Sequence, residues 1–241
     1  MSGHSKWNNI KHKKEKADAA KAKIFTKIGK EMAVAIKAGG PDPNNNSKLR
    51  DLIAKAKANN VPNDNIQRTI KKFTDNGDIN FEEIVYEGYG PSGVAIIVET
   101  STDNRNRTAG NVRAAFSKYG GNLGQNGCVG YLFEEKGVIT IVDEDDEIDE
   151  DKIMEDALEC GAEDIKSDEG EYTIYTAAED LDAVRDAIIA AGYQINTADL
   201  AKVPSTYVEL TSEEDIANME KMLDKFNEDD DVNAVYHNWD M

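Results

Sequence analysis

The hydrophobic pattern changes at about Asn80, and this change constrains the fold more than any other feature of the sequence. Before Asn80, apolar residues recur with the 3.6-residue period of amphipathic helices. After it, short apolar segments, glycine-rich turns and further helical segments follow one another, which is typical of strands mixed with helices. The sequence therefore predicts an α+β protein in which a helical N-terminal domain precedes sheet-containing domains.

Residues 1–80 are predicted to hold a basic arm over residues 1–15 and three helices. The first helix covers residues 16–38 and ends at a Gly-Gly-Pro sequence, because glycine supplies a left-handed cap and proline cannot continue the helix. The second helix begins near Ser47, and the third is capped by Asp64. Each helix has one apolar face, so we expect a small, basic three-helix domain.

Residues 81–135 and 204–241 are predicted to form one α+β domain that is interrupted in sequence. It opens with a β-hairpin, and a helix capped by Thr102 or Asp103 follows. The expected strands are Phe81–Glu87, Val94–Thr100, Val129–Phe133, Thr206–Leu210 and Val232–Tyr236. We expect the C-terminal strands, together with a helix at about residues 212–227, to complete the sheet that the hairpin begins.

Residues 136–203 are predicted to form a third domain, inserted into the interrupted one. Their pattern has the order β-α-β-β-α-β, which is that of the ferredoxin-like fold. The expected elements are, in chain order, residues 138–142, 149–159, 163–167, 171–176, 179–191 and 193–202.

The formal net charge of −19 conceals a strong asymmetry. Residues 1–80 contain 17 Lys and Arg and 8 Asp and Glu, a net charge of +9. Residues 81–241 contain 11 Lys and Arg and 39 Asp and Glu, a net charge of −28. A polyanion is attracted to the first part and repelled by the second. The asymmetry therefore favours nucleic acid as a partner of the first 80 residues.

The basic arm combines lysines with aromatic rings, and this combination suits nucleic acid. Ammonium groups neutralise phosphates, and an indole ring stacks on an unpaired base. The candidate nucleic-acid-binding residues of the arm are Lys6, Trp7, Lys11, His12, Lys13, Lys14 and Lys16. The alternative is a solvated basic tail with Trp7 packed against the helical domain.

The first predicted helix carries a stripe of lysines roughly opposite its apolar face: Lys16, Lys23, Lys27, Lys30 and Lys37. In isolation this stripe would be an ordinary solvated face. Next to the basic arm, we expect it to extend a surface that follows the phosphate backbone.

Five long motifs in the first half of the chain resemble the YebC family. They are residues 3–14, Gly39–Pro43 with Asn46–Arg50, Tyr86–Ala95, Thr102–Thr108 and Phe116–Leu123. The resemblance implies a helical N-terminal domain followed by two α+β domains. It also implies a probable transcriptional regulator that binds DNA. Mitochondrial members are described as translational activators of cytochrome c oxidase, and bacterial members as ribosome-associated factors that assist proline-rich nascent chains.

Arg105 and Arg107 lie in the fourth motif, at a predicted helix N-terminus, where backbone N–H groups favour anions. The motif is open to two interpretations. The arginines contact RNA or another phosphate, or the segment caps its helix and forms salt bridges to the acidic body.

Catalytic, metal and membrane functions find little support in the sequence. The turn at residues 88–93 lacks the Gly-Lys-Ser/Thr ending of a P-loop and is better explained as a hairpin turn. The acidic run Asp143–Asp151 lacks EF-hand spacing, and Cys128 and Cys160 lack zinc-site spacing. No segment is long and apolar enough for a transmembrane helix. We therefore expect a cytoplasmic protein without cofactor, metal, membrane or small-molecule substrate.

Three hypotheses follow from these features. The first is a non-enzymatic, nucleic-acid-binding regulator of gene expression, whose target is DNA or, as an alternative, ribosomal RNA on the ribosome. The second is an adaptor whose acidic domains bind a basic protein. The third and weakest is a metal-dependent enzyme. The absence of a base-reading helix-turn-helix and the aromatic arm favour RNA on physical grounds, whereas the family's customary description favours DNA.

Overall fold

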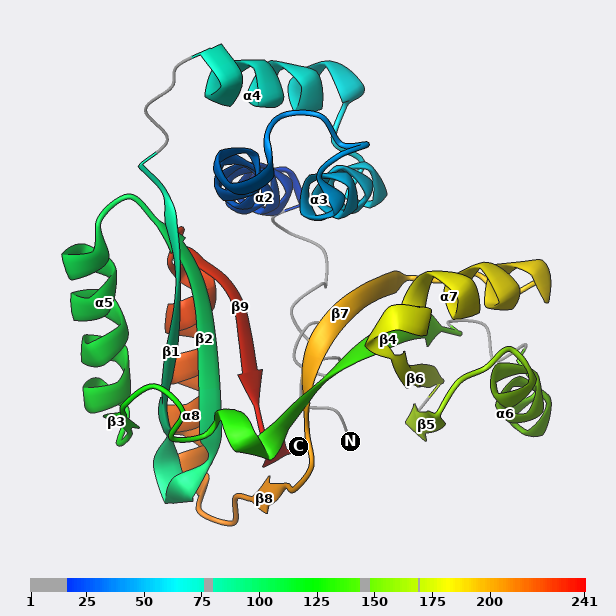
Figure 1. The fold of residues 1–241 in the computed structure, drawn as a ribbon. Helices are drawn as coiled ribbons and strands as arrows, with labels where there is room; N and C mark the ends of the chain where they lie inside the picture. The colour runs from blue at the N-terminus through cyan, green and yellow to red at the C-terminus, as the bar shows by residue number, and fades with distance from the viewer. Residues whose placement is uncertain (1–16, 76–79, 144–147, 169) are drawn as a thin grey trace. The chain divides into compact units, whose positions relative to one another are not determined.

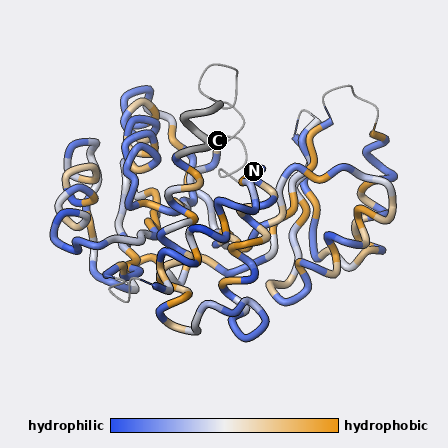
Figure 2. Tube along the Cα trace, turned by 90° about the horizontal axis from the view of Figure 1, so that it is seen from above, coloured by the Kyte–Doolittle hydropathy of each residue, from blue (hydrophilic) through white to orange (hydrophobic). Residues whose placement is uncertain are grey.

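The computed structural model describes residues 17–75, 80–143, 148–168 and 170–241. Among these, residues up to 129 together with 211–235 form a larger compact unit. Residues 130–210 together with 236–241 form a smaller one. Figure 2 shows hydrophobic residues interspersed with hydrophilic ones along the helices and strands, rather than gathered in long segments. In this part of the chain, no helix has the length and apolar character needed to cross a bilayer.

The larger unit begins with three helices, α2 (Ala17–Gly39), α3 (Ser47–Ala58) and α4 (Asn63–Asp75) (Figure 1). Their apolar faces meet in one buried cluster, as the helical period predicts. The fully buried members include Ile28, Met32, Leu49, Ala56 and Ile66.

The N-termini of α3 and α4 differ in how they begin. Asn46 caps α3: its side chain accepts a hydrogen bond from the Leu49 N–H at 3.1 Å. The prediction that Asp64 caps α4 is wrong. The helix already begins at Asn63, and Asp64 lies in its first turn, where a negative charge still interacts favourably with the helix dipole.

The sheet of the larger unit has the strand order β3-β1-β2-β9. β1 (Glu82–Tyr89) and β2 (Ala95–Thr102) form the antiparallel hairpin, and β3 (Asn122–Leu123) pairs with β1. The last strand, β9 (Val232–His237), comes from the C-terminus and lies beside β2, where the Ser101 N–H donates to the Asp231 carbonyl at 2.8 Å. The expectation that the C-terminal segment completes this sheet is therefore confirmed for its strand at residues 232–237, but not for the strand expected at residues 206–210, which lies in a separate two-stranded sheet.

Two helices of the same unit, α5 (Arg105–Lys118) and α8 (Glu213–Glu228), pack against each other. The ring centroids of Phe116 on α5 and Phe226 on α8 lie 5.3 Å apart, and both rings are buried. Nearly every residue of the central strand β2 is buried, which explains the continuous aliphatic run at its start.

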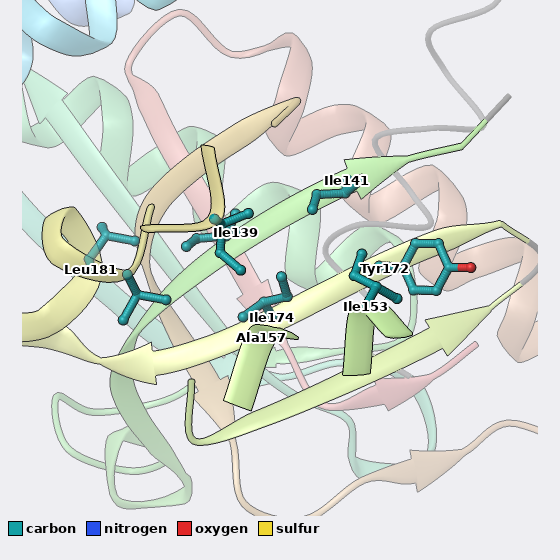
Figure 3. Close-up of a cluster of buried hydrophobic side chains, with 9 residues drawn as sticks. Ile139, Ile141, Ile153, Ala157, Tyr172, Ile174 and Leu181 are labelled. Carbon is teal, nitrogen blue, oxygen red and sulfur yellow. The ribbon is translucent and has the colours of Figure 1, made fainter. Parts of the chain in front are cut away.

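The smaller unit contains β4 (Phe133–Val142), α6 (Glu150–Glu159), β5 (Asp164–Asp168), β6 (Glu171–Ala177), α7 (Leu181–Ala190) and β7 (Thr197–Pro204). Its sheet has the order β5-β6-β4-β7, with every neighbouring pair antiparallel. This is the ferredoxin-like arrangement. Figure 3 shows its buried aliphatic cluster, to which β4, β6, α6 and α7 contribute. The predicted fold class is thus confirmed.

Three strand predictions in this unit differ from the structure. The strand expected at Val129–Phe133 is a short 3₁₀ helix, Gly130–Leu132, followed by β4. The strand expected at 138–142 begins earlier, at Phe133, because β4 pairs with β7 along its whole first part, from Phe133 opposite Pro204. The strand expected at 206–210 is shortened to β8 (Val208–Glu209), which pairs in parallel with β10 (Trp239–Asp240).

The remaining short elements are two further 3₁₀ helices, Pro91–Gly93 and Ala178–Asp180. The division of the chain into three domains at residues 80/81, 135/136 and 203/204 stays a prediction.

Candidate nucleic-acid interface

The predicted arm residues Lys6, Trp7, Lys11, His12, Lys13, Lys14 and Lys16 lie outside the described residues. Their proposed contacts with phosphates and bases therefore stay predictions. The described part of the chain places the other five candidates: three lysines of α2 and two arginines of α5.

The three lysines of α2 are directed at the end of α8 and the segment that follows it. The Lys23 ammonium donates to the Glu228 carbonyl at 2.6 Å, and the Lys27 ammonium to the Asn227 carbonyl at 3.4 Å. Lys30 donates to the Asp230 carbonyl at 2.9 Å. These carbonyls belong to the last turn of a helix and the residues after it, where backbone acceptors lack helical partners and the dipole favours cations.

Lys27 is partly buried. Burial and, secondly, the neighbouring charge of Lys23 lower the pKa of its ammonium to about 8. Asp230 and Asp229 act in the opposite direction but are outweighed. The three lysines are therefore engaged within the protein, and their role in nucleic-acid binding stays a prediction.

Asp231 is the centre of a buried hydrogen-bond cluster that joins four elements. Its Oδ1 accepts from Lys30 of α2 at 2.6 Å. Its Oδ2 accepts from Arg107 Nη2 at 2.6 Å and from Thr108 Oγ1 at 2.9 Å, both on α5. The Thr102 hydroxyl of β2 lies 3.3 Å from the same oxygen. Only 3% of Asp231 is exposed.

The surroundings of Asp231 shift its pKa in two opposing directions. Burial raises the pKa of the carboxyl, because charge is disfavoured away from water. Hydrogen bonds from Lys30, Arg107 and Thr108 favour the charged form and outweigh burial, so the pKa is lowered to about 2. The carboxylate is therefore ionised over the whole neutral range.

Arg105 and Arg107 both form ion pairs at the N-terminus of α5. Arg107 Nη2 lies 2.8 Å from Asp103 Oδ1, in addition to its contact with Asp231. Arg105 Nη2 lies 2.7 Å from Glu82 Oε2. These contacts match the structural interpretation of the motif, and a role of the two arginines in binding RNA or phosphate stays a prediction.

The helix cap in this motif is neither Thr102 nor Asp103. Asn104 has an extended backbone, and its side chain accepts from the Arg107 N–H at 3.0 Å. Thr102 is instead the last residue of β2, and its hydroxyl accepts from the Asn104 N–H at 2.9 Å. The predicted cap was wrong because the strand extends two residues further than its apolar pattern indicates.

The glycine-rich motif at residues 88–93 is a hairpin turn, as predicted. A Cβ on Gly88 would lie 2.6 Å from the Asn122 carbonyl oxygen, so only glycine permits the close approach of β3. The adjacent Glu87 carboxylate accepts from the N–H groups of Gly127 and Val129, both at 2.8 Å. The motif thus holds a neighbouring loop in place.

The basic residues of α3 and α4 are all exposed, whereas Lys23, Lys27 and Lys30 of α2 are partly buried. The exposed residues are Lys48, Arg50, Lys55, Lys57, Arg68, Lys71 and Lys72. Among the described residues, Lys57, Arg68 and Lys71 have no oppositely charged group within salt-bridge distance.

A cavity of about 550 Å³ lies beside the Asp231 cluster in the larger unit. Lys30, Arg107, Lys118 and Lys225 contribute cations to its lining, and residues 228–231 contribute carboxylates. In the described part of the chain, no group of His, Cys, Asp and Glu side chains could hold a metal ion.

Asp231 is the residue that sequence reasoning missed. It belongs to the acidic run Glu228–Asp231 at the end of a predicted helix, and such runs are usually solvated. The one available signal was its position immediately before a predicted strand.

Two family models match this chain and together span most of it. The one described as "TACO1/YebC protein N-terminal domain" matches residues 5–76, and the one described as "TACO1/YebC second and third domain" matches residues 81–239.

Similar proteins include a "Probable transcriptional regulatory protein" from Agathobacter rectalis, 57% identical over 241 residues and covering both chains completely. A protein of the same description from Lachnoclostridium phytofermentans is 54% identical, again with complete coverage of both chains. Among solved structures, a conserved hypothetical protein from Aquifex aeolicus is 44% identical, with a TM-score of 0.84 over 98% of this chain and 97% of that one.

Proposed function

The chain belongs to the TACO1/YebC family, and on that premise we propose that it is a non-enzymatic regulator of gene expression that binds nucleic acid through its basic N-terminal part. The observation that carries the proposal is the placement of cations on α3 and α4. Their lysines and arginines are exposed, and together the two helices carry seven basic and three acidic residues. Such a surface favours a polyanion, whereas residues 81–241, with a net charge of −28, repel it.

The relatives support a regulatory role, because they are named probable transcriptional regulatory proteins. Duplex DNA is therefore the first target to test. Folded ribosomal RNA is the alternative, which the aromatic and basic composition of the arm favours.

The experiment compares two matched double variants of the full chain. Lys57→Gln/Lys71→Gln removes two exposed charges from the proposed surface, and Lys152→Gln/Lys221→Gln removes two exposed charges from the acidic part. If each lysine of the first pair neutralises a phosphate, the slope of log K against log salt should fall by about 1.4 to 1.8. The second variant should leave the slope nearly unchanged.

Both variants are titrated against random-sequence duplex DNA and against folded ribosomal RNA. If the slope of the Lys57→Gln/Lys71→Gln variant falls more with one nucleic acid than with the other, that nucleic acid is identified as the target. Equal slopes for wild type and both variants, with both probes, would exclude α3 and α4 as the interface. Failure of the wild-type chain to bind either probe would reject the proposed function itself.

A further inference from the structure

The lysines of α2 are occupied by oxygen atoms from the C-terminal part of the chain. Four acidic residues in a row, Glu228–Asp231, begin at the last residue of α8. This segment offers backbone carbonyls and carboxylates to Lys23 and Lys30, and the Asn227 carbonyl immediately before it accepts from Lys27. A phosphate backbone offers lysines the same kind of partner: closely spaced, negatively charged oxygens.

The contacts on α2 differ in how firmly they are held. Asp231 is buried, and its carboxylate is also bound by Arg107 and Thr108, so its contact with Lys30 belongs to the core. Asp230 is peripheral: 68% of its side chain is exposed, and its carboxylate lies 3.9 Å from the Lys23 ammonium. Exposed ion pairs of this kind contribute little stability.

Lys23 and Lys27 would also be stabilised by a stronger anionic partner. About a third of the Lys23 side chain is exposed, so a ligand can reach it. Lys27 has a lowered pKa because it is buried close to Lys23, so the present surroundings only partly compensate its charge. A phosphate placed between the two ammonium groups would compensate both.

We propose that the acidic segment Glu228–Asp231 competes with nucleic acid for Lys23 and Lys27 of α2. In the absence of nucleic acid, the segment covers these two lysines. A bound phosphate backbone displaces its outer part, while Asp231 keeps its hydrogen bonds to α5. The proposal rests on the proposed function and adds its regulation: affinity is reduced by an intramolecular competitor.

The test compares two variants with equal changes of charge on the same helix and the residues just after it. Glu228→Gln/Asp230→Asn neutralises the outer part of the competing segment. Glu213→Gln/Glu214→Gln neutralises two exposed residues at the opposite end of α8, about 20 Å away at 1.5 Å per residue. Affinity for random-sequence duplex DNA and for folded ribosomal RNA is measured at low salt with the full chain.

The first variant should bind about three- to fivefold more tightly than wild type, since one exposed ion pair is worth at most about fivefold. The control variant should change affinity by less than about twofold. In a Lys23→Gln/Lys27→Gln background, the effect of the first variant should fall to that of the control, because the competing segment then has nothing to cover.

Equal effects of the two acidic variants would overturn the competition, since both would then report only the overall charge. An undiminished effect in the Lys23→Gln/Lys27→Gln background would overturn it as well. In either case wild-type binding would still uphold the proposed function. A wild-type chain that binds neither probe would defeat both proposals.

Discussion

The two large sheets of this protein are assembled in different ways. The sheet β5-β6-β4-β7 comes from one continuous stretch of chain, and its core cluster is built from aliphatic side chains and one tyrosine. The sheet β3-β1-β2-β9 takes its last strand from the C-terminus, and a buried carboxylate, Asp231, lies immediately before that strand.

The difference reflects what each sheet must specify. Apolar burial is strong but non-directional, and it suffices where short connections already determine which strands can pair. A strand that returns from far along the chain needs directional contacts to select its place. Asp231 provides them through its hydrogen bonds with Lys30, Arg107 and Thr108. These bonds require particular positions of their atoms, whereas an aliphatic cluster tolerates other packing arrangements more easily.

The largest expected effect is that of Asp231→Asn. The substitution keeps the size of the side chain but leaves Lys30 and Arg107 facing a neutral group in a buried place. Unfolding of the larger unit should become easier by about 3–5 kcal/mol, seen as faster amide hydrogen exchange in β2 and α5. Asp230→Asn, one residue earlier and exposed, is the control and should change stability by less than about 0.5 kcal/mol. If Asp231→Asn and Asp230→Asn lost similar amounts of stability, the buried hydrogen bonds of Asp231 would not distinguish this sheet from the aliphatic one.

The corresponding change in the aliphatic core is Ile174→Ala. Ile174 is fully buried in the cluster drawn in Figure 3, so truncation leaves a cavity. The expected cost is about 3 kcal/mol, measured by hydrogen exchange in β4 and β6. Because no charge is involved, the loss should be the same at pH 7 and at pH 4. A strong dependence on pH would show that polar contacts also control this sheet.

The pH dependence of stability should separate the two regions further. The pKa of Asp231 is lowered to about 2, against about 3.9 in an unfolded chain. Its contribution is therefore complete above about pH 4 and is lost as the pH falls through 2. Wild type should lose about 2 kcal/mol more than Asp231→Asn between pH 5 and pH 2, measured by denaturant titration. If the stability of wild type and of Asp231→Asn changed equally with pH, Asp231 would not stabilise the fold as a charged group.

A smaller effect is expected for Asn46→Ala, which removes hydrogen bonds between residues that lie close together in sequence. The Asn46 amide donates to the carbonyls of Ala35 and Gly40, both at 2.8 Å, and its oxygen caps α3. Loss of these bonds should cost about 2 kcal/mol in thermal unfolding. Asn44→Ala removes only one exposed hydrogen bond, from the Asn44 side-chain amide to Asp42 Oδ1 at 3.1 Å, and serves as the control, with an expected cost below about 0.5 kcal/mol.

The smallest effect on stability is expected for Lys57→Gln/Lys71→Gln. Both side chains are exposed, so the melting temperature should stay within a few degrees of that of wild type. Any loss of nucleic-acid binding in this variant then reports a lost contact rather than a damaged fold. A large fall in melting temperature would show that these lysines support the helices and would invalidate them as probes.

Much of the fold follows from local sequence patterns. The helical period before Asn80, the hairpin around residues 88–93 and the β-α-β-β-α-β order of residues 136–203 all predict elements that the structure contains. These features depend on neighbours within a few positions, where side-chain direction and turn geometry are set by the backbone itself. The strand at Val129–Phe133 was wrong because the pairing of β4 with β7 decides where that strand begins.

The sequence by itself thus determined the elements, their order and the separation of a basic part from an acidic one. Only the tertiary structure decided which charges meet. Lys30 and Asp231 are 201 positions apart, and no local pattern pairs them. Lys23, Lys27 and Lys30 would be free of these partners if the end of α8 lay elsewhere. The chain's charges attract one another non-specifically, and it is close packing of the distant elements that brings particular partners within hydrogen-bond distance.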